Sequence, residues 1–380
     1  MGVKNLNVYL DNSATTKPCE KSVKKVLEMM NEKFGNPSSL HMCGFTAKKE
    51  IDSARHTLSS FLGCEDKEVF FTPSGTVANN TAIFGTANAK RREGKKVVTT
   101  LLEHPSVLKC FENLNERGFD VVFLKPNING KIDIDELSNA VDENTVLVSM
   151  MAVNNEVGSI QDFAKVKSVI KNKKSKAYFH CDAVQAFGKM QIKPKKLGID
   201  LMSMSAHKIH GVKGAGALFV NDSVRISPYI LGGGQENGMI SGTESTPLIC
   251  AFAEAVNDIG NVERNLHNVT LVRDYFVNKI IELDRVYINS PQDALPYIIN
   301  ISVEGVPSQV MLNSLSSMGI YVSAGSACAK GHRSDVLTAM GVSPAGIDSA
   351  IRISLSKFTT EKDMDMLYNG IVETMNRVRR

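Results

Sequence analysis

The chain of 380 residues contains no tryptophan and only seven cysteines, which are scattered and include no Cys-x-x-Cys pair. The odd number and irregular spacing argue against a disulfide framework and against a zinc module. No apolar run approaches the roughly 18 residues of a membrane span, and no apolar signal segment follows Met1. We therefore expect a cytoplasmic protein with no membrane partner and no metal site.

An excess of one charge is also missing, because 44 Lys and Arg stand against 40 Asp and Glu, for a net charge of +4. A net charge this small does not indicate the crowded basic face of a nucleic-acid-binding domain. No stretch of the sequence interleaves basic and aromatic residues. We therefore expect no direct contact with nucleic acid. A hydrophobic content of 43% is typical of a globular protein, and the length allows two domains.

Short, nearly continuous apolar runs alternate with helical patterns through the first part of the chain. Continuous apolar runs are typical of strands in a parallel sheet that is covered on both faces. The expected strands are 67–72, 95–103, 119–126, 145–153, 176–184, 199–206 and 216–220. The expected helices are 74–93, 105–117, 134–141 and 162–173. This alternation predicts a doubly wound α/β layer.

The pattern changes after about residue 245. One long helical stretch, 247–284, leads into three shorter apolar runs. The expected strands are 297–303, 321–327 and 349–356, with helices near 308–318 and 361–379. We expect a second, smaller α/β domain there.

Polar side chains follow five of the expected strands. Ligands of open parallel sheets bind outside the carboxyl ends of the strands, so these residues mark a candidate site. They are Ser74-Gly75-Thr76, Glu103-His104, Asn154-Asn155-Glu156, Asp182 with Gln185, and His207-Lys208. Five strands that end in polar, titratable residues at one edge predict a functional site.

The chemistry of these residues fits pyridoxal phosphate. Ser74-Gly75-Thr76 begins a helix whose free N–H groups suit a phosphate, although a plain helix cap has the same pattern. Asp182 is a candidate partner for a pyridinium nitrogen, or else a turn residue. Lys208, at a strand exit beside His207, is a candidate Schiff-base nucleophile. Together they supply what this cofactor requires.

Other side chains of the sequence are also consistent with a pyridoxal phosphate site. His104 can stack on the cofactor ring, and either Gln185 or Asn155 can bond the ring hydroxyl. Arg352 stands inside the apolar run 349–356, where a bidentate carboxylate or a structural ion pair would explain it.

A second candidate centre surrounds Cys328 in the small-residue segment 323–335. A free cysteine is often a buried apolar residue. Here Lys330, His332 and Arg333 follow closely, and positive neighbours favour the reactive thiolate. We therefore expect Cys328 to be a nucleophile.

At this point the chain resembles cysteine desulfurases of the NifS/IscS type, which are fold-type I pyridoxal phosphate enzymes related to class V aminotransferases. The motifs that carry the resemblance are YLDNSATT, NEKFGNPSSLH, FTPSGTVANN, EHPSV, AVNNEVG, CDAVQAFGK, SAHKIHGVKGAG, GGGQENGMISGT, SAGSAC and IRISLSKFTTEKD. They occur in family order over essentially the whole chain. The resemblance implies a homodimer with the active site at the interface. It also implies a large, mostly parallel cofactor domain of residues 13–260, and a small domain of 1–12 and 261–380 that carries the Cys328 loop.

The resemblance also implies a role for each matching position. Lys208 would bind the cofactor covalently, Asp182 would hold the ring nitrogen, and His104 would stack and help proton transfer. Gln185 resembles the residue that bonds the ring hydroxyl. The expected cofactor contacts are Gly75, Thr76, His104, Asn155, Asp182, Gln185, Ser205, His207, Lys208 and, from the second subunit, Thr243. The expected substrate contacts are Asn155 and Arg352.

The implied reaction removes sulfur from L-cysteine, giving L-alanine and a persulfide on Cys328. An acceptor protein would then take the sulfur, either an iron–sulfur scaffold or a tRNA-thiolation enzyme. Three departures from scaffold-serving members leave the acceptor open. The Cys328 loop is shorter and lacks a proline, Asn237 and Ile240 stand where relatives often carry arginine, and the chain ends soon after its last helix.

Three other readings compete with this one. A selenocysteine lyase or another pyridoxal phosphate lyase would use nearly the same residues. A transaminase needs no thiol, so Cys328 argues against it. Intact Lys208, Asp182 and Cys328 argue against a non-catalytic scaffold that keeps only the fold.

Overall fold

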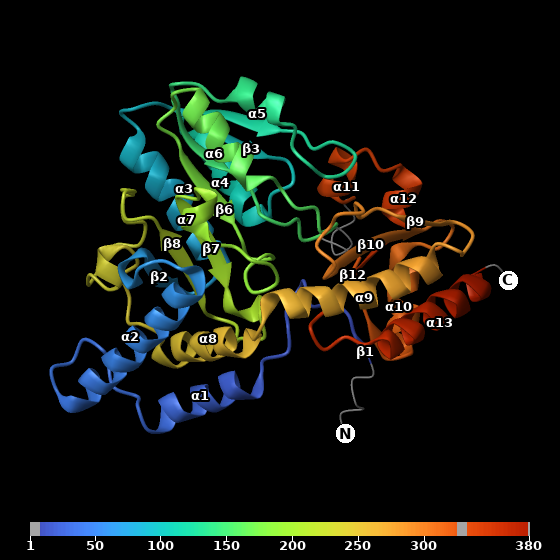
Figure 1. The fold of residues 1–380 in the computed structure, drawn as a ribbon, viewed down its shortest axis with the longest axis horizontal. Helices are drawn as coiled ribbons and strands as arrows, with labels where there is room; N and C mark the ends of the chain where they lie inside the picture. The colour runs from blue at the N-terminus through green and yellow to red at the C-terminus, as the bar shows by residue number, and fades with distance from the viewer. Residues whose placement is uncertain (1–7, 325–332, 379–380) are drawn as a thin grey trace.

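A seven-stranded sheet dominates the computed structural model, which describes residues 8–324 and 333–378 (Figure 1). The spatial order of its strands is β2-β8-β7-β6-β5-β3-β4. The strands are β2 (Val69–Thr72), β3 (Lys96–Thr100), β4 (Asp120–Leu124), β5 (Thr145–Ser149), β6 (Tyr178–Asp182), β7 (Leu201–Ser205) and β8 (Gly216–Val220). Each of the seven lies inside a predicted strand, so the predicted α/β layer is confirmed.

Strand β8 is the one strand of this sheet that runs antiparallel to its neighbours, β2 and β7. The sheet is therefore mostly parallel, as the sequence predicted. The physical reason is the short connection from Ser205 to Gly216, because a parallel crossover needs a dozen or more residues. Strand β2 then runs in the same direction as β7, so the predicted site strands share one carboxyl edge.

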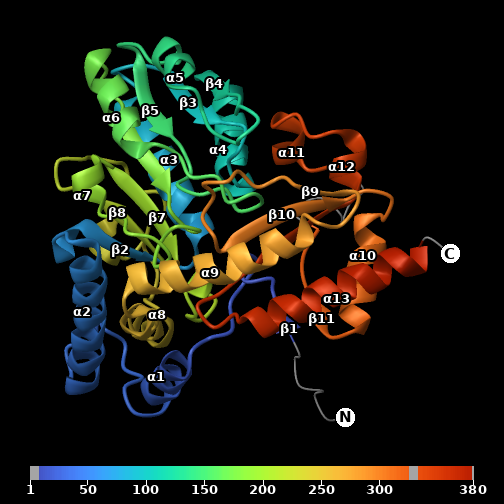
Figure 2. The same ribbon diagram turned by 45° about the vertical axis from the view of Figure 1, so that its right-hand side comes forward.

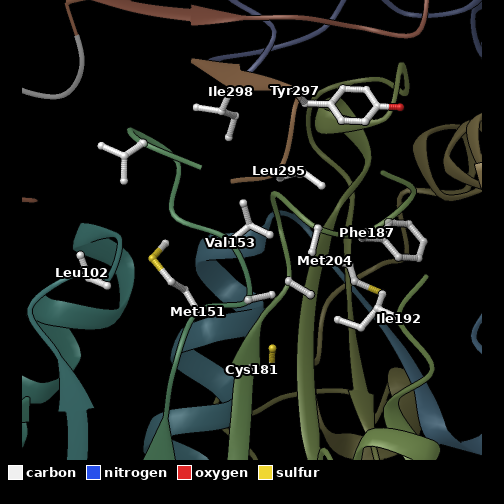
Figure 3. Packing of buried hydrophobic residues seen from close by; sticks show 14 of the residues in the cluster. Leu102, Met151, Val153, Cys181, Phe187, Ile192, Met204, Leu295, Tyr297 and Ile298 are labelled. Atoms are coloured by element: carbon white, nitrogen blue, oxygen red, sulfur yellow. The ribbon is translucent and has the colours of Figure 1, made fainter. Parts of the chain in front are cut away.

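Helices bury both faces of the large sheet, which explains the continuous apolar runs. Neighbouring residues of one strand point to opposite faces: Val97 packs beneath α3 and α4, whereas Val98 joins the core on the other face. Figure 3 shows part of that second core, where Cys181 and Met204 lie near Phe187 and Ile192. The helices against these faces are α3 (Gly75–Lys90), α4 (Pro105–Glu116), α5 (Ile134–Ala140), α6 (Phe163–Asn172) and α7 (Pro194–Leu197).

Two helices that the sequence did not predict, α1 (Glu20–Asn31) and α2 (Met42–Leu62), pack on α8 (Thr246–Ile259) below the large sheet (Figure 1). The helical stretch predicted over 247–284 consists of two helices, because α8 ends before Gly260 and α9 (Val262–Ile280) begins after it. Gly260 has a φ of +71°, which glycine adopts at little cost. The Asn261 side chain then caps α9 by accepting from the N–H of Arg264.

The C-terminal part contains an antiparallel sheet of order β12-β10-β9 and a two-stranded parallel pair, β1 with β11. These strands are β1 (Val8–Tyr9), β9 (Val286–Ile288), β10 (Ile298–Val303), β11 (Ile320–Tyr321) and β12 (Ala350–Ser354). Of the strand predicted over 321–327, only Tyr321 belongs to β11, Ser323 pairs with Arg352 in an isolated bridge, and residues 325–327 lie outside the described residues. The helices there are α10 (Ser308–Ser317), α11 (Asp335–Ala339), α12 (Pro344–Asp348) and α13 (Glu361–Val378).

The N-terminal segment joins the two parts of the molecule. After β1, the amide of Asn12 donates to the carbonyl oxygen of Ser354 at 2.8 Å, and the N–H of Ser13 donates to the Ser354 hydroxyl at 2.9 Å. In both views α9 runs from beneath the large sheet toward the small one (Figures 1 and 2). The domain limits 13–260 and 261–380 stay a prediction. Over the described ranges, no helix has the length and apolarity to cross a membrane.

Candidate active site at the carboxyl ends of the strands

A cavity of about 560 Å³ opens where β2, β3, β5, β6 and β7 end. Its volume lies in the range of small-molecule sites. The predicted residues that line it are Gly75, Thr76, His104, Asn155, Asp182, Gln185, Ser205, His207, Lys208 and Arg352. Eight of these ten were predicted from strand ends, whereas Ser205 was predicted from the family resemblance and Arg352 from its place inside an apolar run; their individual roles stay predictions.

Two predicted residues are not part of this set. Thr243 is exposed in the segment before α8 and does not line the cavity of its own chain. Its expected action from a second subunit stays a prediction. Cys328 lies outside the described residues, as do Lys330 and His332.

The first turn of α3 closes one side of the cavity. The Ser74 hydroxyl accepts from the N–H of Val77 at 3.2 Å, while the N–H groups of Gly75 and Thr76 have no acceptor within the helix. A Cβ on Gly75 would lie 2.8 Å from the Val184 side chain, so only glycine lets the helix approach the strand ends this closely. This helix start is therefore suited to a phosphate.

Lys208 follows β7 in a single 3₁₀ turn, Ala206–Lys208, and its amine reaches the N-terminal segment. Nζ donates to the carbonyl oxygens of Ser13 and Ala14, the latter at 2.8 Å. Burial lowers the pKa of Lys208 to about 8, and the positive charge of Arg352 adds to this effect. The amine is thus held in place and is far easier to deprotonate than an exposed lysine.

Asp182 is linked to His104 through two neutral side chains. Asn79 Nδ2 donates to Asp182 Oδ2 at 2.7 Å and to the hydroxyl of Ser106 at 2.8 Å. Ser106 in turn contacts His104, with 2.8 Å between its hydroxyl oxygen and Nδ1. The buried carboxylate therefore accepts hydrogen bonds from Asn79 and from the N–H of Val184, and no Lys or Arg of the described residues forms an ion pair with it.

His104 caps α4, because its Nδ1 accepts from the N–H of Ser106 at 3.1 Å. An accepting Nδ1 leaves the ring proton on Nε2 in the neutral form. Burial lowers the pKa of His104, and nearby Lys208 lowers it further, against the opposing effect of Asp182. The ring is therefore neutral near pH 7, which suits stacking and proton transfer.

Gln185 is held from both ends of its amide. Its Nε2 donates to the carbonyl oxygen of Ser13 at 3.0 Å, and its Oε1 accepts from Lys189 Nζ at 2.9 Å. Lys189 is buried, which lowers its pKa to about 7, and Lys208 lowers it further. The amide orientation is thus fixed with its NH₂ group toward the N-terminal segment.

Arg352 enters the cavity from β12 and has a carboxylate partner, as the sequence suggested. Its Nη2 donates to Asp11 Oδ1 at 2.9 Å, and Nη1 donates to the carbonyl oxygen of Asn155 at 3.1 Å. Only one nitrogen contacts the carboxylate, so the expected bidentate pair is replaced by a single-point ion pair.

Glu103 is a buried cavity residue to which sequence reasoning gave no role. Its Oε1 accepts from the N–H of Met151 at 2.8 Å and from the hydroxyl of Thr100 at 2.8 Å. Burial raises the pKa of Glu103 to about 8, so the side chain is a neutral acid near pH 7.

The residues present fit pyridoxal phosphate. Ser13 Oγ, Asn79 Oδ1, Glu103 Oε2 and Arg352 Nε are buried at the cavity and have no hydrogen-bond partner among the described residues. Buried polar atoms are normally satisfied, so these atoms indicate a polar ligand. Gly75 and Thr76 would hold the phosphate, Asp182 the ring nitrogen and Lys208 the aldehyde. No cluster of His, Cys, Asp or Glu suited to a metal ion occurs within 8–324 and 333–378.

Comparison with known proteins gives matches over the full length. Residues 8–367 match the family described as aminotransferase class-V. The cysteine desulfurase IscS of Methanosarcina thermophila is 38% identical over 384 residues, which cover 100% of this chain and 94% of that protein. A solved NifS-like protein is similar at a TM-score of 0.92 with 35% identity, covering 97% of this chain and 99% of that one. A structure of SspA in complex with cysteine matches at 0.83 with 32% identity, covering 93% and 100%.

Proposed function

Since the chain belongs to the aminotransferase class-V family and is a pyridoxal phosphate-dependent cysteine desulfurase, we propose that it acts on L-cysteine through Lys208, Asp182, Arg352 and Cys328. The predicted family, fold class and cofactor are thereby confirmed. One observation carries the assignment of roles. Lys208 and Asp182 line a single cavity that also contains the first turn of α3, where the N–H groups of Gly75 and Thr76 have no acceptor within the helix.

Bound pyridoxal phosphate supplies an aldehyde that joins to amines and a ring that accepts electrons from a neighbouring carbon. Asp182, which accepts hydrogen bonds from Asn79 and the N–H of Val184, would hold a proton on the ring nitrogen. Lys208 would hold the cofactor through its amine nitrogen. Once freed by the amine of the substrate, that nitrogen would remove the Cα proton, a task that suits its lowered pKa.

The substrate carboxylate is proposed to bind Arg352, with Asn155 beside it. Arg352 is buried and its carbonyl contact to Asn155 keeps the two residues together. Charge-assisted hydrogen bonds from a guanidinium are well suited to a carboxylate. This contact orients the amine of the substrate toward Lys208.

Cys328 is proposed to receive the sulfur. Its thiolate attacks the substrate sulfur, so that an S–S bond forms as the carbon–sulfur bond breaks. The electron pair of the broken bond stays on carbon, and two protons complete L-alanine, one of them the proton that Lys208 removed. Cys328 keeps the sulfur as a persulfide, which passes to an acceptor protein. An iron–sulfur scaffold and a tRNA-thiolation enzyme are the two acceptor classes that we propose.

Product analysis tests this function directly. We expect the holoenzyme, supplied with L-cysteine and a reducing thiol, to release L-alanine and sulfide in equal amounts. L-Serine, which lacks the sulfur, should yield no alanine. Release of pyruvate and ammonia in place of alanine would contradict the proposal, and a strong preference for L-selenocysteine would favour a selenocysteine lyase.

A homodimer is proposed because apolar side chains of the helical hairpin formed by α1 and α2 are not covered by other described residues of the same chain. Phe34 and Met42 are each 73% exposed, and Leu40 and Phe45 are also exposed, all between or within α1 and α2. Exposed apolar patches of this kind mark association surfaces. We expect sedimentation velocity to give about twice the chain mass of 41.4 kDa, and charged replacements at Phe34 and Leu40 to lower that value. A wild-type mass of one chain would contradict the dimer.

A further inference from the structure

Asp11 forms an ion pair with the guanidinium of Arg352, which is the group proposed to bind the substrate carboxylate. The ion pair between Asp11 Oδ1 and Arg352 Nη2 spans 2.9 Å. Asp11 is half-buried beside Arg352, and its backbone pairs with Ser354, two residues beyond Arg352 on β12. The hydroxyl of Tyr9 also donates to the carbonyl oxygen of Asp11. These backbone contacts fix the Asp11 carboxylate beside Arg352, so the ion pair is not an incidental surface contact.

Arg352 keeps donor capacity beyond this pair. A guanidinium offers five N–H donors, and the described residues accept one from Nη1 and one from Nη2. Its Nε is buried without a partner among the described residues. A second carboxylate therefore finds free donors on Arg352, but it must lie next to the negative charge of Asp11.

We propose that Asp11 is an internal competitor for the carboxylate site of Arg352, which holds the guanidinium in place and weakens the binding of substrate and product. This inference rests on the proposed binding of the substrate carboxylate by Arg352. Like charges that share one cation repel each other, so substrate enters at a cost. L-Alanine carries the same carboxylate as L-cysteine, so the same repulsion speeds product release.

The charge of Asp11 also acts on Lys208. Asp11 and Asp182 raise the pKa of Lys208, against the larger lowering by burial and by Arg352. The charged or titratable groups near the Lys208 amine are Asp11, His104, Asp182, Lys189, His207 and Arg352. Removing the charge of Asp11 alone must therefore favour the unprotonated form of the Lys208 nitrogen.

The test compares two ligands on the Asp11→Asn holoenzyme. Asparagine keeps an oxygen that accepts from Arg352 but removes the charge. Binding of L-alanine and of L-alaninamide is measured from the change in the visible band of the bound cofactor. We expect the affinity for L-alanine to rise about tenfold, while the affinity for L-alaninamide, which has no carboxylate, changes by about twofold at most.

Two further variants separate charge from position. Asp11→Ala removes both the charge and the acceptor that holds Arg352, so L-alanine should bind more weakly than to Asp11→Asn. Asp11→Glu restores the charge and should return the affinity toward the wild-type value. The pH midpoint of the visible band, which reports protonation of the Lys208 nitrogen, should fall in Asp11→Asn, because Asp11 raises the pKa of that nitrogen. It should not move in Tyr9→Phe, which loosens the segment without altering its charge.

Equal or weaker binding of L-alanine to Asp11→Asn, in a folded protein with an intact visible band, would overturn the inference. Arg352→Ala distinguishes that failure from a failure of the proposed function. Wild-type binding of L-alanine by Arg352→Ala would remove Arg352 from the carboxylate site altogether. Loss of binding there, together with no effect of Asp11→Asn, would leave the function intact and Asp11 purely structural.

Discussion

Lys208→Ala is expected to abolish turnover of L-cysteine, with a loss on the order of 10⁴-fold or more, and to remove the covalent cofactor band. In the structure Lys208 is the cavity amine that the backbone carbonyls of Ser13 and Ala14 hold in place. Its pKa of about 8 leaves roughly a tenth of the amine neutral at pH 7, against about one part in 3,000 at 10.5. Only the neutral amine attacks an aldehyde, so this site is prepared for the cofactor.

The matched control is Lys213→Ala, since Lys213 is exposed in the same glycine-rich turn. We expect that variant to keep both the band and the activity. Absorption spectra of the two purified proteins, followed by assay of alanine, decide the question. An unchanged band in Lys208→Ala would mean that another amine binds the cofactor, and buried Lys189 would be the first to examine.

Cys328→Ser is expected to keep the cofactor band but to lose release of alanine and sulfide on the order of 10³-fold or more. No cysteine of the described ranges lines the cavity. Cys110, Cys181 and Cys250 are buried, and burial raises the pKa of each thiol, to about 12 for Cys110 and Cys250. These three are poor nucleophiles, which supports Cys328 as the sulfur acceptor.

The controls are Cys19→Ser and Cys43→Ser, because these two cysteines are at least partly exposed. Both variants should retain activity within about twofold. Mass spectrometry after a single turnover should find one added sulfur in the wild type and none in Cys328→Ser. Full activity of Cys328→Ser would place the sulfur-accepting group elsewhere.

The large sheet was predictable because its strands are buried on both faces, as Val97 and Val98 illustrate. The antiparallel direction of β8 was not predicted from the apolar pattern, although the short connection after Ser205 indicates it. Helices α1 and α2 were missed because exposed apolar residues such as Leu27 and Met30 blur their buried faces. The break at Gly260 was overlooked because the apolar period continues on both sides of it.

The site was predictable wherever a residue lies at the end of a strand or within a few residues of it, as Asp182 and Lys208 do. Asn79, Ser106 and Asp11 were not predicted, since their positions depend on packing between distant segments. Asn79 lies inside α3, and only its 2.7 Å hydrogen bond to Asp182 shows that it belongs to the site. Asp11 lies in the motif YLDNSATT, but its pairing with Arg352 joins residues 341 positions apart.

That separation has a consequence for how the protein is made on the ribosome. The segment that holds Lys208 from the N-terminal side is itself held by Ser354, through Asn12 and Ser13. During synthesis the large sheet can assemble once β8 has emerged, but the first residues must wait for nearly the whole chain. A truncated nascent chain therefore has a folded sheet without a finished cofactor pocket, and coenzyme capture becomes one of the last events of biogenesis.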